Sequence, residues 1–253
     1  MTVLCYHAVN PQWASPLSMH PDTFAAQCDW VARNRTILPL TEAVKRLTPR
    51  GTLPRGLCAL TFDDGFASVH DHAWPVLARH RLPATVFLVA QTLTEQGQEV
   101  DWIDTPPPYE TRTLTLDQVL EMQEAGVAFE SHSLTHADLT RLTYEECLAD
   151  LRSSRELLET VLGRPVRLLA YPRGRHAPHV RAAAEKAGYS HAFALPEGPE
   201  PVGSYALPRV GLYRDNGMRA LRVKTAPPYL PVRTGRAFQV AQRATRLVSG
   251  LRP

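Results

Sequence analysis

The feature that most constrains the fold of this 253-residue chain is a regular alternation of short apolar segments with longer amphipathic ones. The apolar segments are short enough to be strands, and glycine or proline bounds several of them. The segments between them repeat apolar residues at helical spacing, and three of these end at a glycine. Alternating strands and helices predict βα units on a parallel sheet, so we expect an α/β fold whose sheet closes, or nearly closes, as a barrel.

The alternation gives expected boundaries for the individual elements. Strands are expected at 3–9, 36–38, 56–60, 84–89, 127–132, 166–172, 190–195 and 205–212. Helices are expected from Pro21 onward and at 41–47, 69–81, 116–125, 143–162 and 177–187. Thr41 is a plausible N-cap, and Thr143 with Glu146 matches a capping box. Residues 91–113 are polar and break the alternation, which predicts a long loop over one mouth of the barrel.

Charge is distributed unevenly along the chain. Residues 201–253 carry ten Lys and Arg against one acid, a net of +9, so the preceding 200 residues carry −6 of the total of +3. We therefore divide the chain into a barrel at 1–215 and a basic C-terminal extension at 216–253, with a helix expected over 233–248. This extension either packs on the barrel with solvated arginines or binds an anionic membrane surface or a membrane-bound synthase. No nucleic-acid partner is expected.

The cysteines and the apolar runs of the chain indicate the cellular compartment of the protein. The four cysteines are scattered without a C-x-x-C pair, which indicates buried reduced thiols. No signal peptide is visible and no run of 18 apolar residues occurs, so we expect a cytoplasmic protein without a transmembrane helix.

Two adjacent carboxylates, Asp63 and Asp64, follow the apolar run 56–60. In α/β folds the carboxyl ends of the strands are where ligands and catalytic groups gather. Successive side chains of a strand point to opposite faces, so the two aspartates can take different roles if the chain bends at Gly65. The alternative is a capped turn before a helix.

A histidine pair, His132 and His136, begins where another strand is expected to end. Histidines four apart face the same way if the chain turns helical there. Two histidines and one carboxylate are a common three-ligand set for Zn²⁺ that leaves a position open for water. A chance pair of surface histidines is the alternative, but both motifs fall on the same face of one barrel.

The residues of these two segments match a known family. Thr-Phe-Asp-Asp-Gly at 61–65 and His-Ser-Leu-Thr-His at 132–136 resemble the first and second motifs of the polysaccharide deacetylases, the NodB-homology carbohydrate esterases. The resemblance extends over about four-fifths of the chain, from residue 6 to residue 210. It implies a deformed (β/α) barrel of about seven strands and a divalent metal, usually zinc. It also implies that Asp64, His132 and His136 are the ligands and that Asp63 is the general base.

The third motif departs from the better-known members. Ala-Tyr-Pro-Arg-Gly at 170–174 resembles it, which implies that the N–H of Arg173 helps to form the oxyanion hole, although Pro172 and Gly174 also suit a turn. The arginine that restrains the base in those members is absent there. We propose Arg209 as its substitute, because a lone arginine in an apolar strand needs a charged partner. A distance beyond about 6 Å between Arg209 and Asp63 would refute this.

The general acid is also expected at a different place. The C-terminal Leu-x-His of many members is missing, because the last histidine is His191 at the start of a strand. His7 is the alternative, since the Tyr-His start of the chain resembles the poly-N-acetylglucosamine deacetylases, in which this histidine protonates the leaving amine. The competing interpretation is a structural histidine. Trp102, in the long loop, either stacks on a sugar ring or caps the barrel.

The resemblance and the chemistry together predict a metal-dependent hydrolase that removes N-acetyl groups from an N-acetylhexosamine-containing glycan. Its partner is then the acetylated glycan. Two alternatives stay open: an O-acetyl esterase with the same site, and a non-catalytic glycan-binding or assembly module on a degenerate barrel.

Overall fold

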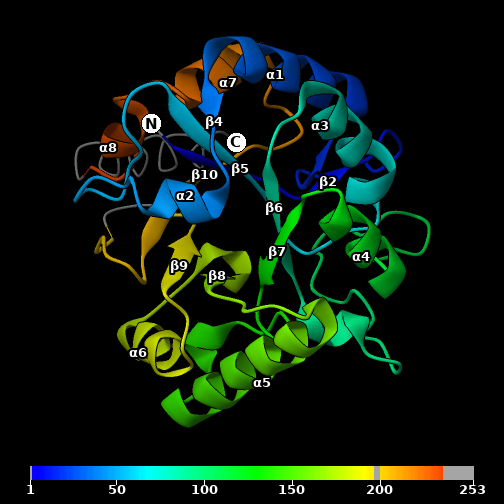
Figure 1. Cartoon of the computed structure of the whole chain (residues 1–253), viewed down its shortest axis with the longest axis vertical. Helices are drawn as coiled ribbons and strands as arrows, with labels where there is room; N and C mark the ends of the chain where they lie inside the picture. The colour runs from blue at the N-terminus through cyan, green and yellow to red at the C-terminus, as the bar shows by residue number, and fades with distance from the viewer. Residues whose placement is uncertain (1, 197–199, 236–253) are drawn as a thin grey trace, which may run out of the picture.

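A closed parallel barrel of seven strands forms the centre of the molecule (Figure 1). The computed structural model describes residues 2–196 and 200–235. The strand order is β1-β10-β9-β8-β7-β6-β5, and β1 pairs with β5 to close the ring. The strands are β1 (Val3–Tyr6), β5 (Leu57–Phe62), β6 (Ala84–Leu88), β7 (Ala128–Ser131), β8 (Leu168–Ala170), β9 (His191–Ala194) and β10 (Leu207–Gly211). The predicted α/β barrel is therefore confirmed.

Three further strands are very short. β4 (Thr36–Ile37) pairs with the first residues of β5, and β1 pairs with the last ones. β6 pairs with the other edge of β5, so β4 and β1 lie along the same edge of β5. β4 therefore lies where the barrel closes, beside the N-terminal end of β5. β2 (Ala8–Val9) and β3 (Ser18–Met19) form a separate ribbon.

Eight α-helices surround the barrel in the described part of the chain (Figure 1). They are α1 (Pro21–Asn34), α2 (Leu40–Val44), α3 (Trp74–His80), α4 (Leu116–Glu124), α5 (Tyr144–Leu162), α6 (Pro178–Lys186), α7 (Met218–Lys224) and α8 (Tyr229–Arg233). The capping box of α5 is confirmed, because Thr143 accepts from the N–H of Glu146 and the Glu146 side chain accepts from the N–H of Thr143.

Two expected helices differ from the prediction. The predicted N-cap of α2, Thr41, is wrong. The helix begins at Leu40, and its N-cap is Pro39, which makes no side-chain hydrogen bond. Proline fixes the backbone at this position, so the helix starts one residue before Thr41. The helix expected at 69–81 opens with a turn of π-helix at Val69–Ala73 before α3.

The long loop predicted at 91–113 begins with a short 3₁₀ turn at Ala90–Leu93 and is otherwise almost without helix or strand. Its residues Trp102 and Asp104 line the cavity over the carboxyl ends of the strands. The loop therefore covers that mouth of the barrel, as expected.

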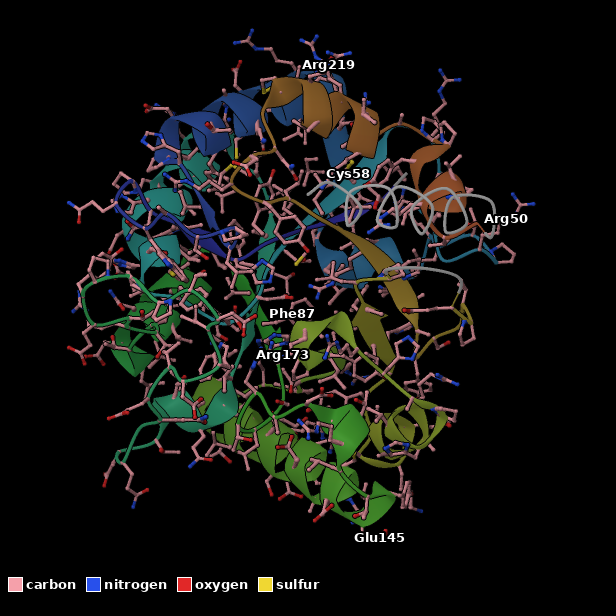
Figure 2. All side chains as sticks on the ribbon, turned by 180° about the vertical axis from the view of Figure 1, so that it is seen from behind. Arg50, Cys58, Phe87, Glu145, Arg173 and Arg219 are labelled. Atoms are coloured by element: carbon pink, nitrogen blue, oxygen red, sulfur yellow. The ribbon has the colours of Figure 1, made fainter. Side chains whose placement is uncertain are left out.

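Period-two alternation along the strands determines which side chains enter the barrel. Val3, Ala59 and Phe87 belong to a buried cluster that α2 also contacts through Leu40. Side chains two residues further along β1 and β5 therefore point inward one layer higher. Viewed from behind, Phe87 and Arg173 lie near the middle of the molecule, whereas Glu145 and Arg219 project at opposite ends (Figure 2). Along β1 and β5, the polar side chains inside the barrel therefore lie above this apolar layer.

The C-terminal segment packs on the barrel as far as it is described. Leu221 of α7 and Leu230 of α8 are buried in the main hydrophobic cluster between strands and helices. The helix predicted over 233–248 lies almost entirely outside the described residues, apart from the end of α8. Within the described ranges, every helix is too short or too polar to cross a lipid bilayer. The four cysteines are free and buried, as expected.

Candidate metal centre and catalytic groups

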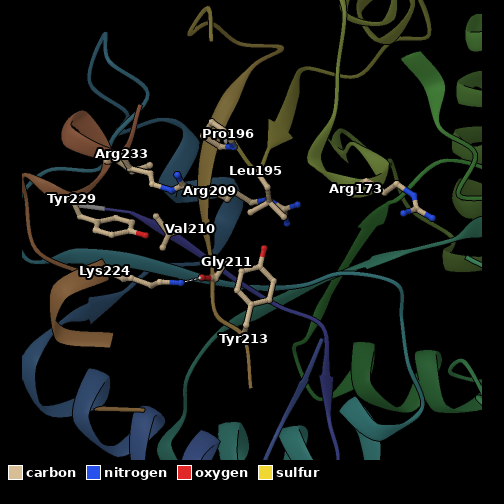
Figure 3. Close-up of a pocket in the computed structure, with 11 residues that line it drawn as sticks. Arg173, Leu195, Pro196, Arg209, Val210, Gly211, Tyr213, Lys224, Tyr229 and Arg233 are labelled. Carbon is tan, nitrogen blue, oxygen red and sulfur yellow. Dashed lines mark hydrogen bonds between the residues drawn. The ribbon is translucent and has the colours of Figure 1, made fainter. Parts of the chain in front are cut away.

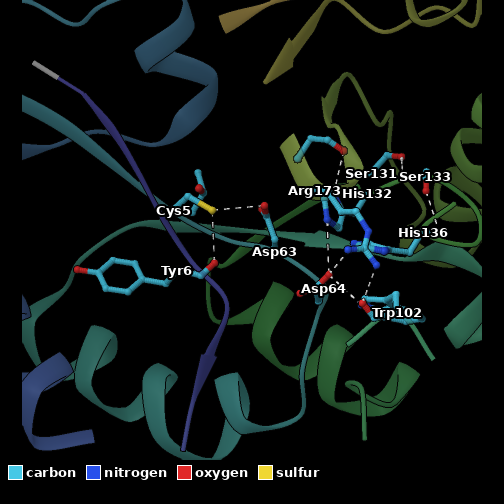
Figure 4. A network of polar contacts seen from close by, with 12 residues as sticks. Cys5, Tyr6, Asp63, Asp64, Trp102, Ser131, His132, Ser133, His136 and Arg173 are labelled. Atoms are coloured by element: carbon cyan, nitrogen blue, oxygen red, sulfur yellow. Dashed lines mark hydrogen bonds and ion pairs between the residues drawn. The ribbon is translucent and has the colours of Figure 1, made fainter. Parts of the chain in front are cut away.

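The two aspartates after β5 turn in different directions (Figure 4). Asp64 has a positive φ of 68°, and Gly65 follows with a φ of 64°. The bend therefore begins at Asp64, one residue before the expected glycine, and a left-handed conformation there is costly for a residue with a Cβ. Such strain at a buried polar residue is typical of functional sites. The bend separates two neighbouring carboxylates that would otherwise repel each other.

Asp64, His132 and His136 come together as a buried cluster. Oδ1 of Asp64 lies 3.1 Å from Nε2 of His136 and 3.6 Å from Nε2 of His132. The two imidazole rings meet edge to face, with centroids 4.9 Å apart. One ligand atom from each residue falls within 4.8 Å of the others, a spacing that can hold a metal ion. A carboxylate oxygen and two imidazole nitrogens suit Zn²⁺ and leave a coordination position open.

Hydrogen bonding prepares His132 as a ligand. Its Nδ1 lies 2.8 Å from the carbonyl oxygen of Ala170, so Nδ1–H donates and Nε2 keeps its lone pair toward Asp64. Burial lowers the pKa of His132 to about 4, which keeps the ring neutral at neutral pH. A neutral imidazole with a free Nε2 is the form that binds a metal.

The chain between the histidines does not form the helical turn that their spacing suggested. Ser133 and His136 both have positive φ, of 69° and 60°. The N–H of His136 donates to Oγ of Ser133, and the N–H of Ser133 donates to Oγ of Ser131. These local side-chain bonds compete with helix formation, so a tight loop presents the two rings instead.

Arg209 clamps the second carboxylate, Asp63. Its NH1 and NH2 lie 2.6 and 2.7 Å from Oδ1 and Oδ2 of Asp63, and NH1 also donates to Oγ1 of Thr61. The distance is well within the 6 Å that the sequence hypothesis required. Burial alone would raise the pKa of Asp63, but the Arg209 charge outweighs it and holds the pKa well below its usual value. Asp63 is therefore an ionised, immobile carboxylate beside the candidate metal centre.

His7 reaches the same cavity from the end of β1. It is buried, with 8% of its surface exposed, and its ring stacks loosely on Tyr213 at a centroid distance of 6.3 Å. In the described part of the chain, its Nδ1 has no hydrogen-bond partner. An imidazole with an unpaired nitrogen in a cavity is suited to donate or accept a proton.

The third motif forms a strained turn beside the cavity. Arg173 and Gly174 both have positive φ, of 56° and 66°. A Cβ on Gly174 would collide with the backbone of Leu195, so only glycine fits there. The Arg173 side chain donates to the carbonyl of Trp102 and lies 3.6 Å from Asp104, which ties this turn to the long loop.

Two side chains have contacts that the sequence did not predict. Trp102 donates from Nε1 to Oδ1 of Asp64 at 3.2 Å and stacks on His136 at a centroid distance of 4.9 Å, so it supports two candidate ligands and also lines the cavity. Cys5 lies 3.3 Å from Oδ2 of Asp63. The inward period of β1 relates Cys5 to His7 and could have identified it, whereas no sequence pattern predicts the bond from Trp102 to Asp64.

A cavity of about 270 Å³ joins these groups. Its lining includes His7, Asp63, Asp64, His132 and His136, and the structure therefore brings the separate sequence motifs to one place. Arg173, Trp102 and Tyr213 complete part of its wall. Arg209 lies behind Asp63, in contact with its carboxylate. The cavity can hold a small acyl group between a cation site and an ionised base.

Comparisons with known proteins agree on one family. Residues 50–192 match the family model described as polysaccharide deacetylase. The chain is 28% identical over 215 residues to YxkH of Bacillus subtilis, covering 83% of this chain and 70% of that protein. It is 27% identical over 210 residues to a poly-beta-1,6-N-acetyl-D-glucosamine N-deacetylase of Staphylococcus epidermidis, covering 78% and 69%. The fold resembles Streptococcus pyogenes deacetylase PplD in complex with acetate, with a TM-score of 0.75, 23% identity and coverage of 90% and 98%.

Proposed function

This chain belongs to the polysaccharide deacetylase family, and from that premise we propose that it hydrolyses N-acetyl groups on an N-acetylhexosamine-containing glycan. As a member of that family it is a polysaccharide deacetylase. The observation that carries the proposal is the cluster of Asp64, His132 and His136 beside the clamped carboxylate of Asp63. The similarity to an N-deacetylase of poly-N-acetylglucosamine supports the substrate class.

The residues of the cluster fit a divalent cation, and we propose Zn²⁺. Asp64, His132 and His136 would hold it, with His132 already turned by Ala170 to present Nε2. When bound, such an ion lowers the pKa of water and polarises the acetyl carbonyl.

The other groups then supply proton transfer and charge stabilisation. Asp63 takes the proton of the attacking water, while Arg209 keeps its carboxylate ionised and oriented. The N–H of Arg173 donates to the oxyanion that forms on the carbonyl. His7 gives a proton to the leaving amine nitrogen as the carbon–nitrogen bond breaks, which yields acetate and a free amino sugar. A protonating group on this side of the cavity favours amide hydrolysis, because an amine is a poor leaving group without a proton.

Metal analysis combined with acetate release tests this function. We expect wild type to hold one equivalent of zinc and to release acetate from N-acetylglucosamine oligomers, whereas Asp64→Ala loses both. Asp22→Ala, in which a 94%-exposed aspartate is removed, is the matched control. Wild type that binds metal but hydrolyses neither N-acetylated nor matched O-acetylated oligomers would point to a non-catalytic glycan-binding module. Faster release from the O-acetylated oligomer would point to an esterase.

Two finer proposals concern location. We propose that the basic extension binds an anionic membrane surface or a synthase. The exposed residues Arg219, Arg222 and Val223 of α7 support this, although residues 236–253 lie outside the described ranges. Co-sedimentation with anionic liposomes, with and without residues 231–253, tests it. The cytoplasmic location stays a proposal that fractionation of the native host tests.

A further inference from the structure

A second cavity, of about 310 Å³, adjoins the candidate active site (Figure 3). The two cavities share Arg173, Leu195 and Tyr213 in their linings, so these residues form the boundary between them. The remaining wall comes mainly from the end of β10 and from α7 and α8. A polymer that places one sugar over the metal centre can therefore extend a neighbouring sugar over this boundary.

The described lining of the second cavity is basic. It contains Arg173, Arg209, Lys224 and Arg233 and no carboxylate. The charge of Arg209 is neutralised by Asp63. Arg173 lies on the side of the cavity away from Lys224 and Arg233 (Figure 3). The positive charge that faces this cavity therefore comes mainly from Lys224 of α7, and Arg233 of α8 also lines it.

Lys224 is held in place by neutral groups. Its Nζ donates to the carbonyl of Gly211 and to Oδ1 of Asn216, both at 2.7 Å, and lies 5.3 Å from the ring centroid of Tyr213. Burial, and then the charge of Arg233, lowers the pKa of Lys224 to about 8. An ammonium that is partly desolvated beside another cation is stabilised when an anion binds, and the charge-assisted hydrogen bonds formed there are stronger than neutral ones.

The second observation in support of a binding site here is the buried Nε of Arg209. Arg209 is 2% exposed and contributes to this lining, and its Nε has no hydrogen-bond partner among the described residues. The aromatic ring of Tyr229 also lines the cavity and offers an apolar face on which a sugar ring can lie. A volume near 300 Å³ is at the small end of ligand pockets, which suits one sugar unit.

We propose that this cavity is a subsite for an anionic group on the glycan, carried by a sugar that flanks the deacetylated N-acetylhexosamine. The anion is a carboxylate, as in a uronic acid, or a phosphate. The subsite rests on the proposed function and narrows it, because the preferred substrate is then an acidic heteropolymer rather than a neutral homopolymer.

The test compares kcat/KM for three oligomers of equal length. One is neutral N-acetylglucosamine, one alternates N-acetylglucosamine with glucuronic acid, and one carries phosphate on the flanking sugar. We expect wild type to prefer one of the acidic oligomers by about tenfold, the effect of one charge-assisted contact. Lys224→Met should abolish that preference and Lys224→Arg should keep it. Arg219→Gln, an exposed arginine on the same helix, is the control and should keep it.

Each outcome decides the proposal. Equal kcat/KM for neutral and acidic oligomers in wild type, or a preference that survives Lys224→Met in protein with native circular dichroism, overturns it. If wild type hydrolyses no oligomer, the proposed function fails, and calorimetric binding of the same oligomers decides the subsite separately. Tighter binding of an acidic oligomer, lost in Lys224→Met and kept in Arg219→Gln, supports the subsite, whereas equal binding rejects it.

Discussion

Replacing Arg209 with methionine removes the guanidinium and keeps much of the apolar volume, so it isolates the buried ion pair. The guanidinium donates to both carboxylate oxygens of Asp63, at 2.6 and 2.7 Å, and to Thr61. Removing one partner of a buried pair leaves an uncompensated charge and costs about 3–5 kcal/mol. Because a folded domain is stable by only about 5–15 kcal/mol, we expect Arg209→Met to fold with a large part of its stability lost.

The same pair gives the loss a definite pH dependence. The folded pKa of Asp63 lies below its unfolded value, because Arg209 outweighs the effect of burial. The pair therefore stabilises fully above the unfolded pKa of about 3.9, and this stabilisation is lost as pH falls through the lower folded pKa. In Arg209→Met the main cause that opposes burial is gone, so burial raises the pKa of Asp63 relative to wild type, against smaller lowering effects of His132 and His7. The deficit of the variant is then largest near neutral pH and narrows on acidification, when Asp63 is protonated.

Urea denaturation in the presence of a chelator measures this free energy without a contribution from metal binding. The control is Asp63→Asn combined with Arg209→Met, which removes both charges and should recover at least half of the lost stability. A loss below about 1 kcal/mol at neutral pH, the level of an exposed ion pair, would refute the reasoning. So would a double variant that is no more stable than Arg209→Met alone.

Three further variants probe the remaining parts of the site. Trp102→Phe keeps the ring stack but removes the N–H bond to Asp64, so zinc affinity measured by chelator competition should fall about 10- to 100-fold; unchanged affinity would show that this bond does not orient the ligand. His7→Ala should keep zinc but lose turnover of N-acetylated oligomers, and an unaltered kcat would dismiss His7 as the acid. Gly174→Ala should lower stability by about 1–3 kcal/mol or more, because its φ of 66° and its contact with Leu195 leave no room for a Cβ; an unchanged melting temperature would contradict that steric conclusion.

Much of the site followed from strand periodicity and chain order. Polar residues directly after apolar strands had to lie at one mouth of a parallel barrel, and Asp63, Asp64 and His132 do lie there. Arg209 could be paired with Asp63 in advance because the family resemblance implies an arginine that restrains the base, and an arginine inside an apolar strand needs a charged partner. The placement of the other residues depends only on which end and which face of a strand each one occupies.

The remaining details depend on contacts between segments that carry no shared pattern. Trp102 lies in an aperiodic loop, and nothing in its neighbours indicates that Nε1 bonds Asp64. The histidine loop misled the sequence analysis because a four-residue spacing fits a helix equally well. Its real shape follows from the serine hydroxyls of Ser131 and Ser133, which bond the backbone locally. Spacing alone cannot distinguish these two conformations.

The bend at Asp64 gives the site its electrostatic balance. Asp63 and Asp64 are adjacent in sequence, yet Asp63 contacts an internal cation, Arg209, and Asp64 contacts the two candidate ligands His132 and His136. The two carboxylates and the guanidinium sum to a charge of −1, which attracts a cation without surrounding it with excess negative charge. A divalent ion in that cluster would change the sum to +1. The oxyanion would develop beside this net positive charge while the proton of the attacking water passes to Asp63, so the arrangement favours the negative charge of the transition state over a neutral bound amide.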